Sequence, residues 1–182
     1  MILVTTAGKV GAHTARLLAA AGHPVRVMVR NPDAHQDLAA DGVELFLGDL
    51  DRPDSIAAAI GGVRSTVLVS PAVPAQEIAV IHAARKAGVE HVTKITSDAT
   101  SDSPIQRRRD HHLIEVALAE SGIPHTLLRS NAYMQNILAL APAIAARSEF
   151  ASSTGRGRIG MVDARDVATV AAIIASSGQC SV

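Results

Sequence analysis

The sequence predicts an α/β fold in which a doubly wound parallel sheet is covered by helices on both faces. Apolar, β-branched runs alternate with helix-patterned segments from one end of the chain to the other. Strands separated by helices in this way form successive right-handed βαβ units, which build a parallel sheet buried on both sides. Gly22, Gly88 and Gly122 each follow a predicted helix and precede a strand, where the left-handed end of a helix suits glycine.

The elements follow from this alternation. Short apolar runs predict six strands, at residues 2–5, 25–29, 43–47, 65–70, 91–96 and 125–130. Helical patterns lie between and after them, at residues 9–21, 34–40, 53–60, 75–87, 105–121, 134–147 and 164–176. The stretch SSTGRGRIG at 152–160 predicts either a mobile loop over the carboxyl edge of the sheet or a simple turn.

Length and composition limit the class of protein. The 182 residues are 48% hydrophobic and 19% charged, which predicts one domain over residues 1–182. Lys plus Arg and Asp plus Glu number 17 each, so no charge excess favours nucleic acid. The apolar stretches are shorter than the roughly 20 residues of a membrane span, and the N-terminus lacks a signal-peptide pattern. We therefore expect a cytoplasmic protein with no membrane segment, and the single Cys180 leaves no internal disulfide.

The stretch TTAGKVG, which follows the first predicted strand, resembles a dinucleotide-binding glycine loop of the Rossmann type. Gly8 and Gly11 keep the spacing of the last two glycines in G-x-G-x-x-G. One of these lets the backbone approach a pyrophosphate, and the other lets the helix pack closely on the strand. The helix that begins at 9–12 directs free N–H groups and its positive dipole end toward the phosphates.

The first glycine of the pattern would fall at Thr6, or at Thr5 in the wider G-x-x-G-x-x-G form, and both positions are threonine. A threonine can make this turn only at negative φ, although its hydroxyl could bind a phosphate. Glycine at a strand-to-helix turn also has a purely structural use, which remains the alternative for this loop. The predicted cofactor-binding residues of the loop are Thr5, Thr6, Gly8, Lys9, Val10 and Gly11.

Arg30, at the end of the second predicted strand, bears on the choice of cofactor. NAD sites usually carry an acidic residue there for the ribose hydroxyls, whereas an arginine can bind a 2′-phosphate through two contacts. The sequence therefore favours NADPH over NADH. The alternative is that Arg30 is an ordinary solvated side chain.

Three segments resemble the NmrA-like members of the atypical short-chain dehydrogenases/reductases, of the NAD(P)H:quinone oxidoreductase type. They are ILVTTAGKVGAHTARLLAAAGHPVRVMVRNP, GVELFLGDLDRPDSIAAAIGGV and HLIEVALAESGIPHTLLRSNAYMQNI, and the likeness covers nearly all of the chain. The last is the most specific, because SGIPHTLLRSNAYMQN is similar to the family signature SGLPWTILRPNxFMQN. The resemblance implies NADP(H) binding and either quinone or azo-dye reduction or redox-sensing regulation.

The resemblance also implies roles for residues outside the glycine loop. Asp49 and Leu50 would border the adenine, Ser70 and Pro71 would lie beneath the cofactor, and Thr96 and Ser97 would lie near the nicotinamide. His111 would be the catalytic residue beside the cleft, and Asn131, Tyr133, Met134 and Asn136 would line the substrate side. The alternatives are that Asp49 is a turn residue, Met134 is core, and His111 pairs with Glu115 on a solvated face.

Two departures from the family pattern bear on chemistry. The glycine loop is one residue shorter than the family's TGATG form, and the C-terminal substrate segment is expected to be reduced or missing. In the wider superfamily the usual proton donor is a tyrosine four residues before a lysine, and this pair is excluded here because the residue four positions after Tyr133 is Ile137. Lys94 and His111 are the remaining candidate proton donors, and the scattered histidines predict no metal site.

The leading hypothesis is an NADPH-dependent oxidoreductase that transfers a hydride to a small quinone-like or carbonyl acceptor without a Ser-Tyr-Lys triad. The competing hypothesis is a non-catalytic NADP(H)-binding, redox-sensing regulatory protein. A Rossmann domain without nucleotide would follow if Thr5 and Thr6 closed the phosphate site. The expected partner is a small-molecule electron acceptor, and a homodimer or a regulatory protein partner is compatible with either of the first two hypotheses.

Overall fold

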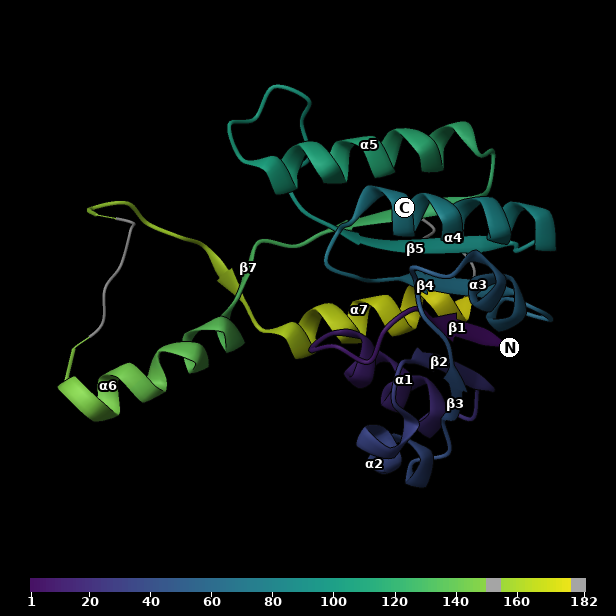
Figure 1. Cartoon of the computed structure of the whole chain (residues 1–182), viewed down its shortest axis with the longest axis horizontal. Coiled ribbons are helices and arrows are strands. Elements are labelled where there is room, and N and C mark those ends of the chain that lie inside the picture. The colour runs from purple at the N-terminus through teal and green to yellow at the C-terminus, as the bar shows by residue number, and fades with distance from the viewer. Residues whose placement is uncertain (150–154, 178–182) are drawn as a thin grey trace.

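A computed structural model describes residues 1–149 and 155–177 of the chain. Its main sheet consists of β1 (Ile2–Val4), β2 (Val25–Val29), β3 (Glu44–Leu47), β4 (Ser65–Leu68), β5 (His91–Thr96) and β6 (His125–Arg129). The strands lie in the order β3-β2-β1-β4-β5-β6, and every neighbouring pair is parallel (Figure 1). This is the order of two βαβαβ halves that meet between β1 and β4. The predicted doubly wound parallel sheet is confirmed.

Helices cover both faces of the sheet (Figure 1). On one face lie α1 (Gly11–Ala20), α2 (Gln36–Ala40) and α7 (Ala164–Ser177), and on the other lie α3 (Pro53–Ala59), α4 (Pro74–Ala87) and α5 (Gln106–Glu120). The apolar core is accordingly split in two. Successive residues of β1 show the division, because Leu3 belongs to the cluster under α3, α4 and α5 while Val4 belongs to the cluster under α1 and α7.

Two predicted helices are each divided in the structure. The segment 34–40 consists of a 3₁₀ helix, η1 (Pro32–His35), followed by α2. The segment 134–147 consists of a second 3₁₀ helix, η2 (Met134–Leu140), followed by α6 (Ala141–Arg147). A proline lies in the first turn of α6. Because proline has no N–H to donate, it favours the start of a new helix over the continuation of the old one.

A second, two-stranded parallel sheet pairs β7 (Ala132–Tyr133) with β8 (Met161–Val162). The sequence did not predict it, because strands of two residues are too short to show an alternating pattern. This pairing brings the start of η2 next to the start of α7. The helix α6 projects away from the main sheet (Figure 1).

Gly22, Gly88 and Gly122 all have positive φ, at 82°, 73° and 72°, as predicted for the turns that follow helices. Cys180 and residues 152–154 of the predicted loop lie outside the described residues. No helix in the described part of the chain is long and apolar enough to span a membrane.

Candidate functional site

A cavity of about 670 Å³ opens at the carboxyl edge of the main sheet. Its walls come from the segments that end or follow all six strands, together with side chains of α5 and η2. It spans the point between β1 and β4 where the strand order reverses, which is where ligands bind in open parallel sheets. The cavity coincides with the place that the sequence predicts for a dinucleotide.

The glycine loop forms one wall of this cavity, and its two glycines have different functions. A Cβ atom at Gly11 would lie 1.9 Å from the carbonyl oxygen of Thr6, so only glycine fits between α1 and the end of β1. A Cβ atom at Gly8 would meet only the Thr6 hydroxyl, at 3.8 Å, and Gly8 lines the cavity. Gly11 therefore serves the packing of the helix, whereas Gly8 leaves backbone open to a ligand. Val10 lines the cavity beside them.

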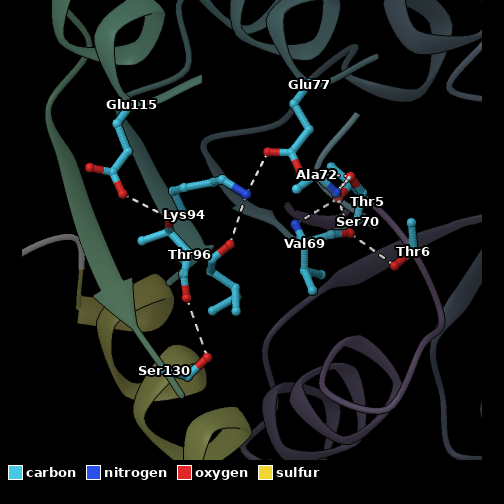
Figure 2. A network of polar contacts seen from close by, with 11 residues as sticks. Thr5, Thr6, Val69, Ser70, Ala72, Glu77, Lys94, Thr96, Glu115 and Ser130 are labelled. Atoms are coloured by element: carbon cyan, nitrogen blue, oxygen red, sulfur yellow. Dashed lines mark hydrogen bonds and ion pairs between the residues drawn. The ribbon is translucent and has the colours of Figure 1, made fainter. Parts of the chain in front are cut away.

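The two threonines fasten the loop to β4 (Figure 2). The Thr5 hydroxyl donates to the carbonyl of Val69 and accepts from the N–H of Val69, both at 2.9 Å. The Thr6 hydroxyl donates to the same carbonyl at 2.9 Å. Neither threonine has positive φ. Both hydroxyl protons are thus donated to the protein backbone, and the loop stays open without its first glycine.

The far end of the cavity carries the residues predicted for the adenosine half of a dinucleotide. Arg30 is exposed there, and no ion pair involves it within the described residues. Asp49 and Leu50 are half-buried and line the same wall. One carboxylate oxygen of Asp49 accepts from the N–H of Asp51 at 3.0 Å, so Asp49 does shape a turn, as its alternative interpretation proposed.

A buried ion pair supports the floor of the cavity at the end of β4 (Figure 2). Lys94 Nζ lies 2.6 Å from Glu77 Oε2 and donates to the carbonyl of Ile95 at 2.7 Å, and neither charged side chain has any exposed surface. The other oxygen of Glu77 accepts from the Ser70 hydroxyl at 2.6 Å, and Ser70 in turn accepts from the N–H of Ala72 at 3.3 Å. Burial lowers the pKa of Lys94, and the Glu77 carboxylate opposes that shift. Pro71 lines the cavity between these partners.

A second carboxylate fixes the end of β5 in the same manner (Figure 2). The Thr96 hydroxyl donates to Glu115 Oε1 at 2.6 Å, and Arg129 Nη2 donates to Glu115 Oε2 at 2.7 Å. The Ser130 N–H donates to the Thr96 carbonyl at 3.0 Å, and the Ser130 hydroxyl lies 3.0 Å from the Tyr133 hydroxyl. Strand ends β4 and β5 are therefore both held by a hydroxyl, a carboxylate and a cation.

His111 faces the cavity from α5 but is almost completely buried, with 6% of its surface exposed. Its Nδ1 atom has no hydrogen-bond partner among the described residues. The predicted alternative, a pair with Glu115, does not form, because Glu115 is bound to Thr96 and Arg129. Burial, followed by the positive charges of Lys94 and Arg107, lowers the pKa of His111 to about 4. The imidazole is therefore neutral at neutral pH.

The substrate side is only partly assembled as predicted. Asn131, Tyr133 and Asn136 line the cavity, and Lys9 of the glycine loop donates to Asn136 Oδ1 at 2.8 Å across the cavity. Met134 does not line it and is 49% exposed, so it is not a core residue either.

Ser97 also lies outside the lining, and its buried hydroxyl has no partner among the described residues.

Comparison with known proteins decides the family. The sequence profile of the NmrA-like family matches residues 1–179. The chain belongs to the NmrA-like family. An NAD(P)H azoreductase of Xenophilus azovorans is 37% identical over 175 residues, which cover 94% of this chain and 61% of that protein. Quinone oxidoreductase 2 of Escherichia coli is 34% identical over 157 residues, which cover 84% of this chain and 55% of that protein.

Solved structures of this family have the same fold. The NADPH-dependent quinone oxidoreductase of Escherichia coli in complex with NADPH superposes with a TM-score of 0.84 at 32% identity, over 98% of this chain and 66% of that one. Triphenylmethane reductase of Citrobacter sp. in complex with NADP(H) gives 0.83 at 29% identity, over 95% of this chain and 64% of that one. This NmrA-like chain spans less than two thirds of the length of the curated relatives described above.

Sequence reasoning missed several residues of this NmrA-like site. Arg107 lines the cavity from the first turn of α5, and Glu77 and Glu115 support its floor. One signal could have found Glu77. The lysine within the apolar strand HVTKIT needs a buried acidic partner, because a fully buried lysine is almost always paired. The sequence does not reveal which acidic residue is the partner of this lysine.

Proposed function

We propose that this chain binds NADPH in the cavity and transfers a hydride to a small quinone-like or carbonyl acceptor. The observation that carries the proposal is the cavity itself, which joins an open glycine loop at one strand end to Arg30 at the next, an arginine with no ion pair in the described part of the chain. The names of three proteins similar to this chain agree with it: an NAD(P)H azoreductase, a quinone oxidoreductase and a triphenylmethane reductase in complex with NADP(H).

The residues present fit a phosphorylated dinucleotide. Gly8 leaves room for a pyrophosphate, because a Cβ there would meet no backbone atom within 4 Å. The N-terminus of α1, with the positive end of its helix dipole, would face that pyrophosphate. Arg30 would bind the 2′-phosphate, since no acid within the described residues neutralises it.

The reduction would need one hydride and one proton. Bound NADPH would supply the hydride, and a proton from solvent would complete the reduction of a quinone to the hydroquinone, leaving NADP⁺. His111 is neutral at neutral pH, so we assign it a hydrogen bond to the acceptor and no role as an imidazolium acid. The protein would chiefly position the acceptor and exclude water.

The test is a fluorescence titration of the chain with NADPH and NADH, followed by a quinone-dependent oxidation assay on the same sample. Arg30→Ala should weaken NADPH binding about tenfold and NADH binding less than about twofold. Arg85→Ala, at an exposed position near the end of α4, is the matched control. Equal losses for both cofactors would rule out the 2′-phosphate contact, and no binding at all would refute the proposal.

A second candidate is an NADP(H)-binding regulatory protein without turnover. A photosystem II assembly factor of Trieres chinensis, 26% identical over 152 residues, is a relative that is not named as a reductase. Binding of NADPH without oxidation over a varied panel of quinones and carbonyl compounds would favour this second function.

A further inference from the structure

The part of the cavity that adjoins α5 carries an uncompensated positive charge. Three consecutive arginines follow Gln106 at the start of this helix, and two of them are bound by other groups of the protein. Arg108 lies 3.1 Å from a carboxylate oxygen of Asp98, and Arg109 donates to the Ser103 carbonyl and to Gln106. Arg107 has no hydrogen bond or ion pair within the described ranges, 1–149 and 155–177, and of these three arginines it is the one that lines the cavity.

The carboxylates near this arginine form no ion pair with it among the described residues, and each has a partner elsewhere. Asp110, three residues further along α5, accepts from the Gln106 side chain at 2.7 Å. Glu115 has both oxygens engaged, by Thr96 and Arg129, and Glu77 lies beneath the floor with Ser70 and Lys94. The acids that line the cavity, Asp49 and Asp51, belong to the end that carries Arg30.

A buried polar atom lies on the same wall. His111 is four residues after Arg107, which places both side chains on one face of α5. Only 6% of the His111 surface is exposed, and its Nδ1 lacks a hydrogen-bond partner among the described residues. A buried nitrogen without a partner is costly, and it is satisfied when a ligand supplies one.

We propose that the electron acceptor of this chain carries an oxyanion substituent, a carboxylate, sulfonate or phosphate, which is bound by Arg107 while His111 hydrogen-bonds a polar atom of the same molecule. This inference rests on the proposed reductase function and names its substrate class. Guanidinium groups bind planar or tetrahedral oxyanions through two parallel hydrogen bonds, which is stronger than a contact with a neutral oxygen.

A matched pair of acceptors tests it. One is a naphthoquinone with a propionate side chain, and the other is its methyl ester, which has the same quinone and no charge. The wild-type chain should have a KM for the propionate about tenfold below that for the ester. Arg107→Gln should remove this difference by raising the KM for the propionate alone, whereas Arg108→Gln, which breaks only the contact with Asp98, should keep it.

The outcomes separate this inference from the function on which it rests. If the ester and the propionate are reduced with the same KM, or if Arg107→Gln changes both equally, the oxyanion site is refuted while the reductase function stands. If neither is reduced, the reductase function fails for quinones. In that case calorimetric titration of both compounds into the NADP⁺-saturated chain still decides: tighter, Arg107-dependent binding of the propionate supports the site, and equal binding refutes it.

Discussion

Thr5 and Val69 join the ends of β1 and β4 through two hydrogen bonds to one hydroxyl. The Thr5 oxygen donates to the Val69 carbonyl and accepts from the Val69 N–H, each at 2.9 Å. Regular pairing of these strands ends at Val4 and Val67, so the side chain extends the connection beyond the ladder. A glycine at this position could not do so. The departure from the glycine pattern is thus a structural support for the loop.

Replacing Thr5 by valine tests this support. Thr5→Val keeps the shape of the side chain but leaves the Val69 N–H without its partner and the Val69 carbonyl with the Thr6 hydroxyl alone, so the free energy of unfolding should fall by about 1–3 kcal/mol. Thr6→Val should cost less, because Thr6 is half-buried and makes one such bond. Urea denaturation of the two variants measures the difference. A larger loss for Thr6→Val would contradict the assignment.

Removing one partner of the buried pair of Lys94 and Glu77 should destabilise the fold strongly, whereas replacing both side chains by apolar ones should destabilise it much less. Lys94→Met leaves a carboxylate buried without its counter-ion and should lower the free energy of unfolding by about 3–5 kcal/mol. The double variant Lys94→Met/Glu77→Leu should regain most of that loss, because an apolar pair can substitute for a buried ion pair. It should still bind NADPH more weakly, since Ser70 loses the carboxylate that orients it.

A surface pair provides the control for this comparison. Arg64 and Glu90 lie 3.5 Å apart with both side chains largely exposed, so Glu90→Gln should change the free energy of unfolding by less than about 1 kcal/mol. Chemical denaturation and a fluorescence titration with NADPH give the two readouts. A double variant as unstable as Lys94→Met would show that Glu77 has another structural function.

Substitutions of the two glycines of the loop should affect different properties, stability at Gly11 and NADPH binding at Gly8. Gly11→Ala forces a methyl group against the Thr6 carbonyl and should destabilise the fold by about 2–3 kcal/mol, as overpacking does. Gly8→Ala has room for its methyl group and should leave the unfolding temperature nearly unchanged. That methyl group would nevertheless enter the cavity, so NADPH affinity should fall. Normal NADPH affinity in Gly8→Ala would remove this residue from the site.

His111 should make stability depend on pH. Its pKa is about 4 in the folded chain, against 6.5 for an ordinary histidine. Between these values the unfolded state takes up a proton that the folded state rejects, so stability is complete above pH 6.5 and falls as the pH is lowered toward 4. His111→Gln should reduce this fall relative to the wild type, and His112→Gln is the control. Unfolding midpoints measured from pH 7 to pH 4 test the prediction.

The sequence predicted the sheet because its signals were local. Runs such as ILV and VRVMV are apolar enough to identify buried strands. Gly88 ends α4 in a left-handed conformation, as expected. The single helix predicted over 134–147 was wrong, because an apolar run such as ILALAPAIAA looks the same in a 3₁₀ helix and in an α-helix. The proline within that run was the available signal.

The sequence predicted the residues of the candidate site that lie at strand ends and missed those that lie on the packed helices. Gly8, Arg30 and Ser70 lie at strand ends, and the edge of a parallel sheet brings such positions together whatever the details of packing. The partners of the floor and of α5 depend on which helix packs over which strand. A chain of apolar helical segments does not specify that arrangement, so Glu77 and Arg107 became visible only in three dimensions.

The packing of α1 against α7 has a consequence for synthesis of the chain. Leu18 of α1 shares its core cluster with Ala168 and Ala171 of α7, although about 150 residues separate them. On the ribosome, the apolar side of α1 therefore emerges long before the helix that covers it. Until residues 164–177 leave the exit tunnel, this face of the nascent sheet is exposed to chaperones and to aggregation, while the opposite face, with α3, α4 and α5, can already close.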